Sequence, residues 1–196
     1  MLEYLENFDQ QLFLFLNQIH SPLFDELMRW ITNRFTWIPL YLLLAYMAFR
    51  KTRLKQFLLI LLSAALLVTL SDQISVHFFK NIFLRYRPCH NEILQSKIHL
   101  INGCGGLYGF VSSHASNTFA MAVFMGMILK SFYPRIMVLL LLWATIVSYS
   151  RIYAGVHYPA DIIIGALLGS LLALLIFKTY GFLVEKLVLT HCLRAK

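Results

Sequence analysis

Ser150, Arg151, His157 and Asp161 lie within twelve positions of one another, in the stretch SRIYAGVHYPAD. Asp161 follows His157 by four residues, near enough to accept its ring N–H and fix the tautomer. A histidine held in this way can act as a nucleophile or as an acid–base group. The guanidinium of Arg151 is a planar fork of donors that suits phosphate oxygens. These residue types together suit the transfer of a phosphoryl group.

An earlier stretch, KNIFLRYRP, carries two further cations. Lys80 and Arg87 are seven residues apart, close to two helical turns. We therefore expect both side chains on nearly one face of a helix, which Pro88 ends. Both could then point at one anionic ligand.

Two predicted helix beginnings stand near these cations. Ser112 and Ser113 occupy the N-cap region before an apolar run, and Pro159 suits the first turn of another helix. Free N–H groups at a helix N-terminus bind anions. His114 adds a second imidazole, so a nucleophile and a proton donor are both available.

Membrane helices must position these residues. The 196-residue chain is 59% hydrophobic and 13% charged, with a mean hydropathy of +0.68. Each apolar run reaches roughly 20 residues with its flanks, enough to cross about 30 Å of hydrocarbon. Long runs that do not alternate favour helices over barrel strands. The predicted class is an all-α polytopic membrane bundle with five transmembrane helices, over the runs 35–49, 57–70, 115–129, 136–149 and 162–177.

The N-terminal segment is of a different kind. Leu2–Ile19 mixes Leu and Phe with acidic residues, and Pro22–Thr32 has apolar residues at helical spacing. We expect interfacial amphipathic helices here, and a sixth span stays open. The predicted organisation is an N-terminal segment, residues 1–33, a transmembrane core, residues 34–178, and a cytoplasmic tail, residues 179–196.

Basic residues near the span ends predict the orientation in the membrane. One set of connections is assigned to the cytoplasm because it holds Arg50, Lys51, Arg53, Lys55, Lys130, Arg135, Lys178, Lys186, Arg194 and Lys196. This scatter over span ends explains most of the net charge of +8 and argues against nucleic-acid binding. The chemically active stretches then share the extracytoplasmic side, where an excess of cations indicates an anionic ligand.

In order and spacing, these stretches resemble the signature of the type 2 phosphatidic acid phosphatase superfamily. Its first motif is a lysine, six residues, then Arg-Pro, and Lys80, Arg87 and Pro88 match it. Its third motif is Ser-Arg, five residues, His, three residues, Asp, and the stretch from Ser150 to Asp161 matches it in full.

The middle motif of that superfamily, Pro-Ser-Gly-His, reads VSSH in this chain. Ser112 and His114 match it, whereas Val111 and Ser113 replace the proline and the glycine. The departure bears on the turn before His114 and leaves the histidine in place.

The resemblance implies a metal-independent phosphoric ester or anhydride hydrolase that uses no cofactor. His157 would attack the phosphorus and become phosphohistidine, with Asp161 orienting it. His114 would protonate the leaving oxygen and then activate water. The groups implied to hold the phosphate oxygens are Lys80, Arg87, Arg151 and the N–H groups of Ser112 and Ser113.

A site at headgroup level implies an amphiphilic lipid phosphate or diphosphate, presented by the bilayer, as the partner. The main expectation is undecaprenyl diphosphate at the extracytoplasmic face of a bacterial inner membrane. Lipid A phosphate is the alternative, followed by phosphatidylglycerophosphate and phosphatidate. The segment Cys89–Val111 is expected to cover the site, and Cys89 and Cys104 are either disulfide-bonded or two free thiols. No oligomeric state is predicted.

Two other functions stay open from the residues alone. His114, His157 and Asp161 could form a two-histidine, one-carboxylate metal site, although nearby cations would repel a divalent ion. The bundle could also transport or bind a lipid phosphate without cleaving it. Of the remaining polar residues, Arg85 is interpreted as a headgroup contact or a catalytic residue, and Asp72 as a span-end cap or a partner of a cation.

Overall fold

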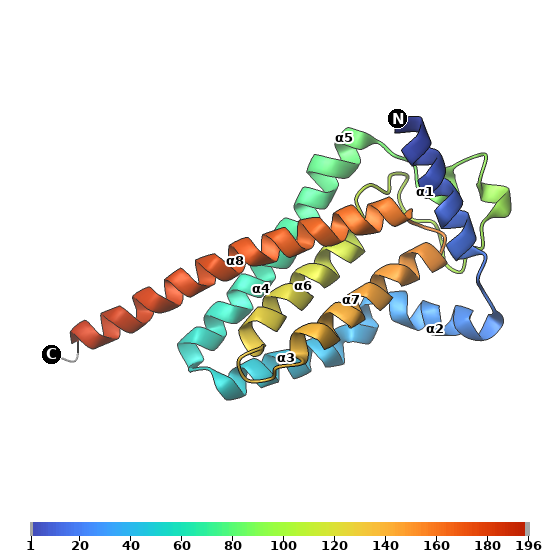
Figure 1. Ribbon diagram of the computed structural model, residues 1–196. Coiled ribbons are helices and arrows are strands. Elements are labelled where there is room, and N and C mark those ends of the chain that lie inside the picture. Colours follow the sequence, from blue (N-terminus) through green and yellow to red (C-terminus); the bar gives the residue numbers. More distant parts are fainter. Residues whose placement is uncertain (1, 195–196) are drawn as a thin grey trace.

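Helices account for most of the chain. The computed structural model describes residues 2–194, with side chains from Glu3 to Lys186, and no β-strand occurs in that part. Lys196 and the side chain of Arg194, two of the cations used to predict orientation, lie outside it. The all-α class is confirmed (Figure 1). The main helices are α1 (Leu2–Asn17), α2 (Pro22–Thr32), α3 (Ile38–Lys51), α4 (Leu54–Ile74), α6 (Ser113–Leu129), α7 (Ile136–Tyr153) and α8 (Pro159–Arg194).

Helix α6 is the core of the bundle, in contact with α4, α7 and α8. Its buried face carries small residues, which let neighbouring backbones approach. On α8, Gly165 and Gly169 meet this face. A Cβ atom at Gly169 would lie 2.0 Å from the Ser116 carbonyl oxygen, and one at Gly165 would lie 2.7 Å from that of Ser112. The two glycines therefore set how closely α8 packs on α6.

The chain is a multi-pass membrane protein. Three helical stretches are long and apolar enough to cross a bilayer: Leu54–Phe83, Ile136–Tyr153 and Pro159–Lys186. The first of them joins α4 to the π-helical turn Ser75–Lys80 and to α5 (Asn81–Phe83). Helices α3 and α6 have 14 and 17 residues, so the count of five spans stays a prediction. Helix α8 continues without a break past Lys178, where the transmembrane core was expected to end.

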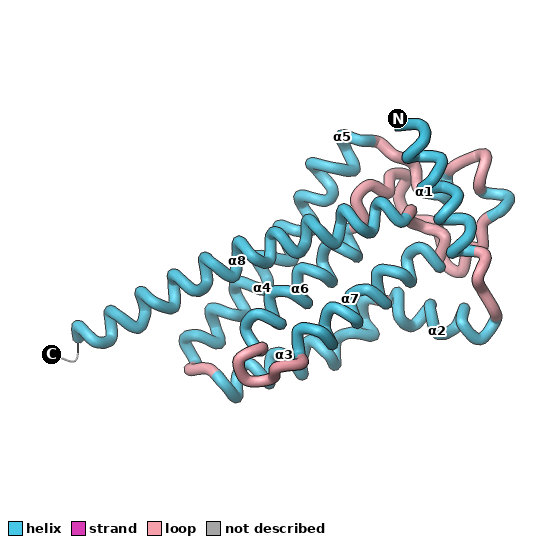
Figure 2. Tube along the Cα trace, viewed as in Figure 1, coloured by secondary structure: helices cyan, strands magenta, loops and turns pink. Residues whose placement is uncertain are grey.

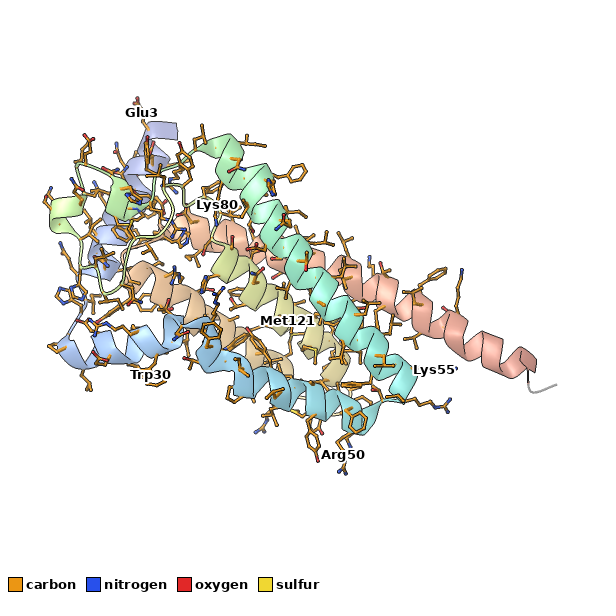
Figure 3. The ribbon with its side chains drawn as sticks, turned by 180° about the vertical axis from the view of Figure 1, so that it is seen from behind. Glu3, Trp30, Arg50, Lys55, Lys80 and Met121 are labelled. Carbon is orange, nitrogen blue, oxygen red and sulfur yellow. A yellow bond between two sulfur atoms is a disulfide. The ribbon has the colours of Figure 1, made fainter. Side chains whose placement is uncertain are left out.

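Different segments of the chain lie at the two ends of the bundle. Helix α1 and the loops around it gather at one end, and the C-terminal end of α8 lies at the other (Figure 2). Glu3 and Lys80 belong to the first end, whereas Arg50 and Lys55 belong to the second (Figure 3). The stretches expected on the outer side thus share one end. Which end faces the cytoplasm stays a prediction.

The long loop between α5 and α6 returns on itself. Leu84 ends α5 in the left-handed region, with φ +49°. The two arms of the loop then pair: Arg87 N–H donates to the Leu107 carbonyl over 3.0 Å, and Gly109 N–H donates to that of Arg85 over 2.9 Å. A disulfide joins Cys89 and Cys104, with 5.9 Å between their Cα atoms. The loop is therefore a closed unit attached at the end of the bundle where α1 lies.

This loop corrects one expectation from the sequence. Lys80 and Arg87 do not share a helix face, because the helix ends at Phe83, four residues before Arg87. Arg87 precedes the short 3-10 turn Pro88–His90 in extended backbone, with ψ 155°. The arginine reaches the end of the bundle on the loop, while Lys80 stays on the π-helical turn.

Helix α1 anchors the loop to α7. The Asn17 amide donates to the carbonyls of His99, over 3.0 Å, and of Tyr153, over 2.9 Å, and its oxygen accepts from His99 N–H over 2.8 Å. Asp25 on α2 adds a second attachment, since it contacts His99 Nε2 at 2.9 Å and accepts from the Tyr153 hydroxyl over 2.6 Å. The N-terminal segment is thus part of the folded end of the bundle.

The predicted orientation gives a labelling experiment. Lys97, in the loop, and Lys130, at the end of α6, are both exposed and lie at opposite ends. In a Cys192→Ser background, we expect a membrane-impermeant thiol reagent to label Lys97→Cys in intact cells and to leave Lys130→Cys unlabelled. Both should react after permeabilisation, which serves as the control. The reverse pattern in intact cells would contradict the orientation.

Candidate active site

His157 lies in the tight connection between α7 and α8 and is only 2% exposed. Gly155 makes this connection possible, with φ +76° and no room for a side chain, since a Cβ atom would lie 2.8 Å from the His99 carbonyl oxygen. Asp161, in the first turn of α8, places Oδ2 3.3 Å from His157 Nδ1 and accepts from Tyr158 N–H over 3.0 Å. The start of α8 therefore brings the predicted pair, His157 and Asp161, together.

The tautomer of His157 follows from its other neighbour. Arg87 Nη1 lies 3.4 Å from His157 Nε2, and a guanidinium can only donate. Nε2 must then be the acceptor, and the ring proton is on Nδ1, facing Asp161. Burial, together with the charges of Arg87, Arg151 and Lys80, holds the pKa of His157 well below its usual value. The imidazole is neutral at ordinary pH, with the lone pair of Nε2 directed at the cations.

The charges of all three predicted cations act on the His157 ring. Lys80 Nζ donates to the Ser113 hydroxyl over 2.8 Å, and Arg151 Nη1 donates to that of Thr32 over 2.5 Å. None of Lys80, Arg87 and Arg151 forms an ion pair with a carboxylate in the described part of the chain. The Nε atoms of both arginines are buried without a hydrogen-bond partner there. An anion with several oxygens would satisfy these donors.

His114 enters from the first turn of α6. The charges of Arg151 and Lys80 act on its ring, which also hydrogen-bonds to the backbone of Thr32. The two predicted histidines thus belong to one electrostatic cluster, and they come from different helix beginnings.

Ser112 and Ser113 have different positions at the start of α6. Ser112 is the N-cap, because its hydroxyl accepts from Ala115 N–H over 3.4 Å. Its own N–H donates to the Asp161 carbonyl over 3.0 Å, so it is not available to a phosphate, contrary to the expectation. Ser113 is the first helical residue, whose N–H has no intrahelical partner. The bond from Ser112 N–H to the Asp161 carbonyl instead fastens the start of α6 to α8.

Two more charged residues complete the site: Asp9, which sequence reasoning did not place here, and Arg85, which it left open as a headgroup contact or a catalytic residue. Arg85 Nη1 donates to Asp161 Oδ1 over 2.9 Å, and its Nη2 donates to Asp9 Oδ2 over 2.7 Å. Asp9 Oδ1 also accepts from Ala160 N–H over 2.9 Å, and the guanidinium lies 4.1 Å from the centre of the Tyr158 ring. Arg85 is therefore neither a headgroup contact nor in contact with the reacting nitrogen. It links helix α1 to the carboxylate that orients His157.

Gly109, near the end of the loop, stands where a side chain has little room. A Cβ atom there would lie 3.1 Å from Asp161 Oδ2, 3.2 Å from Arg87 Cγ and 3.5 Å from His157 Nδ1. The backbone of the loop lies directly against the His157–Asp161 pair.

Within the described chain, the side chains near enough to share a metal ion are His20, Asp25 and His99. The rings of His20 and His99 are stacked with their centres 3.7 Å apart, and this contact attaches the α1–α2 connection to the loop. His114, His157 and Asp161 do not form such a group. The alternative of a metal site at these three residues gains no support from the geometry.

A buried histidine–carboxylate pair facing three cations, at the end of a helical membrane bundle, defines a phosphoryl-transfer site. The family model of the PAP2 superfamily matches residues 53–185, and the chain belongs to that superfamily. It is a membrane lipid phosphatase, a phosphoric ester hydrolase.

Several curated proteins are similar to this chain over most of its length. The Lipid A 4′-phosphatase of Bacteroides thetaiotaomicron is 36% identical over 86% of this chain and 75% of that protein. The Lipid A 4′-phosphatase of Porphyromonas gingivalis is 34% identical over 91% and 75%, respectively. The Undecaprenyl-diphosphatase of Sulfolobus acidocaldarius is 30% identical over 86% and 76%.

Two crystal structures share the fold. Aquifex aeolicus LpxE superposes with a TM-score of 0.62 at 25% identity, over 86% of this chain and 93% of that one. A transmembrane PAP2-type phosphatidylglycerolphosphate phosphatase from Bacillus subtilis gives a TM-score of 0.68 at 21% identity, over 93% and 87%. The second likeness concerns the fold alone.

The link through Arg85 is tested by Asp9→Asn, which removes one anchor of the guanidinium. Asp161 then holds His157 less firmly, so kcat should fall roughly tenfold, on the scale of one charged hydrogen bond, while KM stays within about threefold. Steady-state phosphate release measures both constants. Glu6→Gln, an exposed change on the same helix, is the matched control. An unchanged kcat, or a rise in KM alone, would contradict a positioning role.

Proposed function

We propose that this protein removes a phosphate group from a phosphorylated glycolipid of the lipid A type, at the extracytoplasmic face of a bacterial inner membrane. The similarity to two lipid A 4′-phosphatases, higher than that to the undecaprenyl-diphosphatase, supports this substrate class. The sequence-based preference for undecaprenyl diphosphate is thus less well supported than its alternative. The observation that carries the proposed chemistry is a buried His157 whose Nε2 lies 3.4 Å from Arg87 and on whose ring the charges of Lys80 and Arg151 also act.

In the first step, Lys80, Arg87 and Arg151 hold the phosphoryl oxygens, and His157 Nε2 attacks the phosphorus. A nitrogen–phosphorus bond forms as the bond from phosphorus to the lipid oxygen breaks. His114 gives a proton to that oxygen, which leaves as a hydroxyl group. The cations stabilise the charge on the oxygens in the transition state, where preorganised donors contribute most. The Ser113 N–H is the helix-terminus donor that remains available for the same oxygens.

In the second step, water attacks the phosphohistidine. His114 accepts a proton from the water as the nitrogen–phosphorus bond breaks, and inorganic phosphate is released. His157 returns to its neutral form, with its ring proton still on Nδ1. The Asp161 carboxylate accepts a hydrogen bond from that Nδ1–H in both steps, and Arg85 and Asp9 keep the carboxylate in place. General acid–base groups of this kind typically contribute 10²–10⁴-fold each.

The orientation and the apolar surroundings of the site support a lipid substrate presented from the bilayer. The candidate site lies at the end of the bundle that the charge pattern assigns to the extracytoplasmic side. Exposed Leu, Ile and Phe side chains cover the outer faces of α4, α7 and α8, so a substrate can approach from the membrane plane.

A substrate panel tests the proposal. The purified protein in detergent should release phosphate from lipid A with a kcat/KM at least about tenfold above that for undecaprenyl diphosphate and for phosphatidate, a difference of about 1.4 kcal/mol in transition-state binding. His157→Ala should release none and is the control for contaminating phosphatases. Mass spectrometry of the lipid product identifies the phosphate that is lost. A clear preference for undecaprenyl diphosphate would contradict the proposed substrate class and leave the chemistry unaffected.

A further inference from the structure

A cavity of about 730 Å³ opens beside the candidate active site. Its walls come from the segment that joins α2 to α3, from α4 and from α6. Ser113 and His114 belong both to this cavity and to the site. A ligand whose phosphate lies among the cations could therefore have its adjoining part in the cavity.

The part of the cavity next to His114 is polar, and two acceptors there have no hydrogen-bond partner among the described residues. Asn117 Oδ1 is buried and has no hydrogen-bond partner in the described chain. The carboxylate of Asp72 makes no hydrogen bond or ion pair with another described residue, although its charge acts on Lys80. An acceptor left unpaired away from water costs free energy, and ionisable groups at membrane depth usually mark function. Asn117 Oδ1 is the buried one of the two and Asp72 is half-buried, and both would accept hydrogen bonds from a ligand that brings N–H or O–H donors.

The two acceptors are held in place by the contact between α4 and α6. The hydroxyls of Ser71 and Ser116 are buried and 2.6 Å apart. Asp72 and Asn117 are the next residue on each helix, and both line the cavity. The serine pair fixes the two helices relative to each other, so the acceptors present a preformed pair to a ligand.

The part of the cavity farther from the site is apolar. Trp37, Tyr41, Ala64, Val68, Met121 and Val147 line it. Met121 lies between the end of the bundle marked by Lys80 and the end marked by Lys55 (Figure 3). The cavity thus changes from polar to apolar along the bundle, as the chemistry of an amphiphilic lipid does from headgroup to chain.

We propose that this cavity is a sugar subsite: Asp72 and Asn117 accept hydrogen bonds from hydroxyl or amide N–H groups of the sugar that carries the phosphate, and an attached acyl chain lies along the apolar part. The inference rests on the proposed function and specifies how that substrate class is selected. Phosphatidate and undecaprenyl diphosphate carry no such donors beside their phosphate groups. A ligand without donors would leave the acceptors of Asp72 and Asn117 unpaired, so the site discriminates against such ligands.

The test compares lipid A with phosphatidate as substrates of Asp72→Asn and Asn117→Ala. Asp72→Asn removes the charge that strengthens one hydrogen bond to the sugar, and Asn117→Ala removes another hydrogen bond altogether, so kcat/KM for lipid A should fall by roughly tenfold in each variant. The constant for phosphatidate should fall much less, and the ratio of the two should drop at least about fivefold. Thr145→Val removes a hydroxyl on an exposed face of α7 that only bonds to the Leu141 carbonyl, and it should leave the ratio unchanged.

The two proposals fail in different ways. If the wild-type protein prefers lipid A and both variants keep that preference, the sugar subsite is wrong and the proposed function stands. If kcat/KM for both lipids falls equally in both variants, with the unfolding midpoint in detergent unchanged, the residues serve the chemistry and not selection, which also overturns the subsite. A wild-type protein that does not cleave lipid A overturns the proposed function and the subsite with it.

Discussion

The rest of this structure depends on one constraint: three cations act on one neutral imidazole, and none of them is paired with a carboxylate among the residues that the structure describes. Lys80, Arg87 and Arg151 repel one another, and burial removes the water that would screen them. Such an arrangement persists only if the surrounding chain fixes each cation independently. Lys80 comes from a π-helical turn, Arg87 from a disulfide-closed loop and Arg151 from the last turn of α7. The unbalanced charge is the property that a phosphate group would neutralise.

The acidic side of the site is kept apart from these cations by Arg85. This arginine bonds to Asp161 and Asp9, so the carboxylate behind His157 has its own counter-charge and does not pair with Arg87 or Arg151. The phosphate-binding cations thereby stay available for a substrate. Helix α1 contributes Asp9, and the loop contributes Arg85, which makes both segments part of the catalytic end of the molecule.

The sequence predicted the local features of this structure well. Apolar runs and capping residues placed α4, α6, α7 and α8, and Ser112 is the N-cap where the pattern expected one. The spacing of His157 and Asp161 was enough to predict their contact, because one helical turn brings such residues together. The resemblance to the phosphatase motifs supplied the other predicted residues of the candidate active site.

What the sequence could not predict depends on contacts between distant segments. Asp9 and Arg85 are 76 residues apart, as are Arg85 and Asp161, and no local pattern distinguishes Asp9 from the other acidic residues of α1. The helix was expected to continue to Arg87, yet it ends at Phe83 because the chain turns to pair the two arms of the loop. The lining of the cavity beside the site was equally out of reach of local patterns, since it is built by residues of α3, α4, α6 and α7 together.

The central claim, that the lone pair of His157 is the nucleophile, is tested most directly by trapping the covalent intermediate. His114→Ala protein is mixed with a radiolabelled phosphate ester whose leaving group needs no proton, such as p-nitrophenyl phosphate, and is quenched in alkaline detergent. The account predicts an acid-labile phosphoryl group, located by peptide mass spectrometry on His157, that is absent when His157→Ala is added. A phosphoryl group on His114 of the wild-type protein, or no phosphoenzyme during rapid-quench turnover of active enzyme, would contradict it.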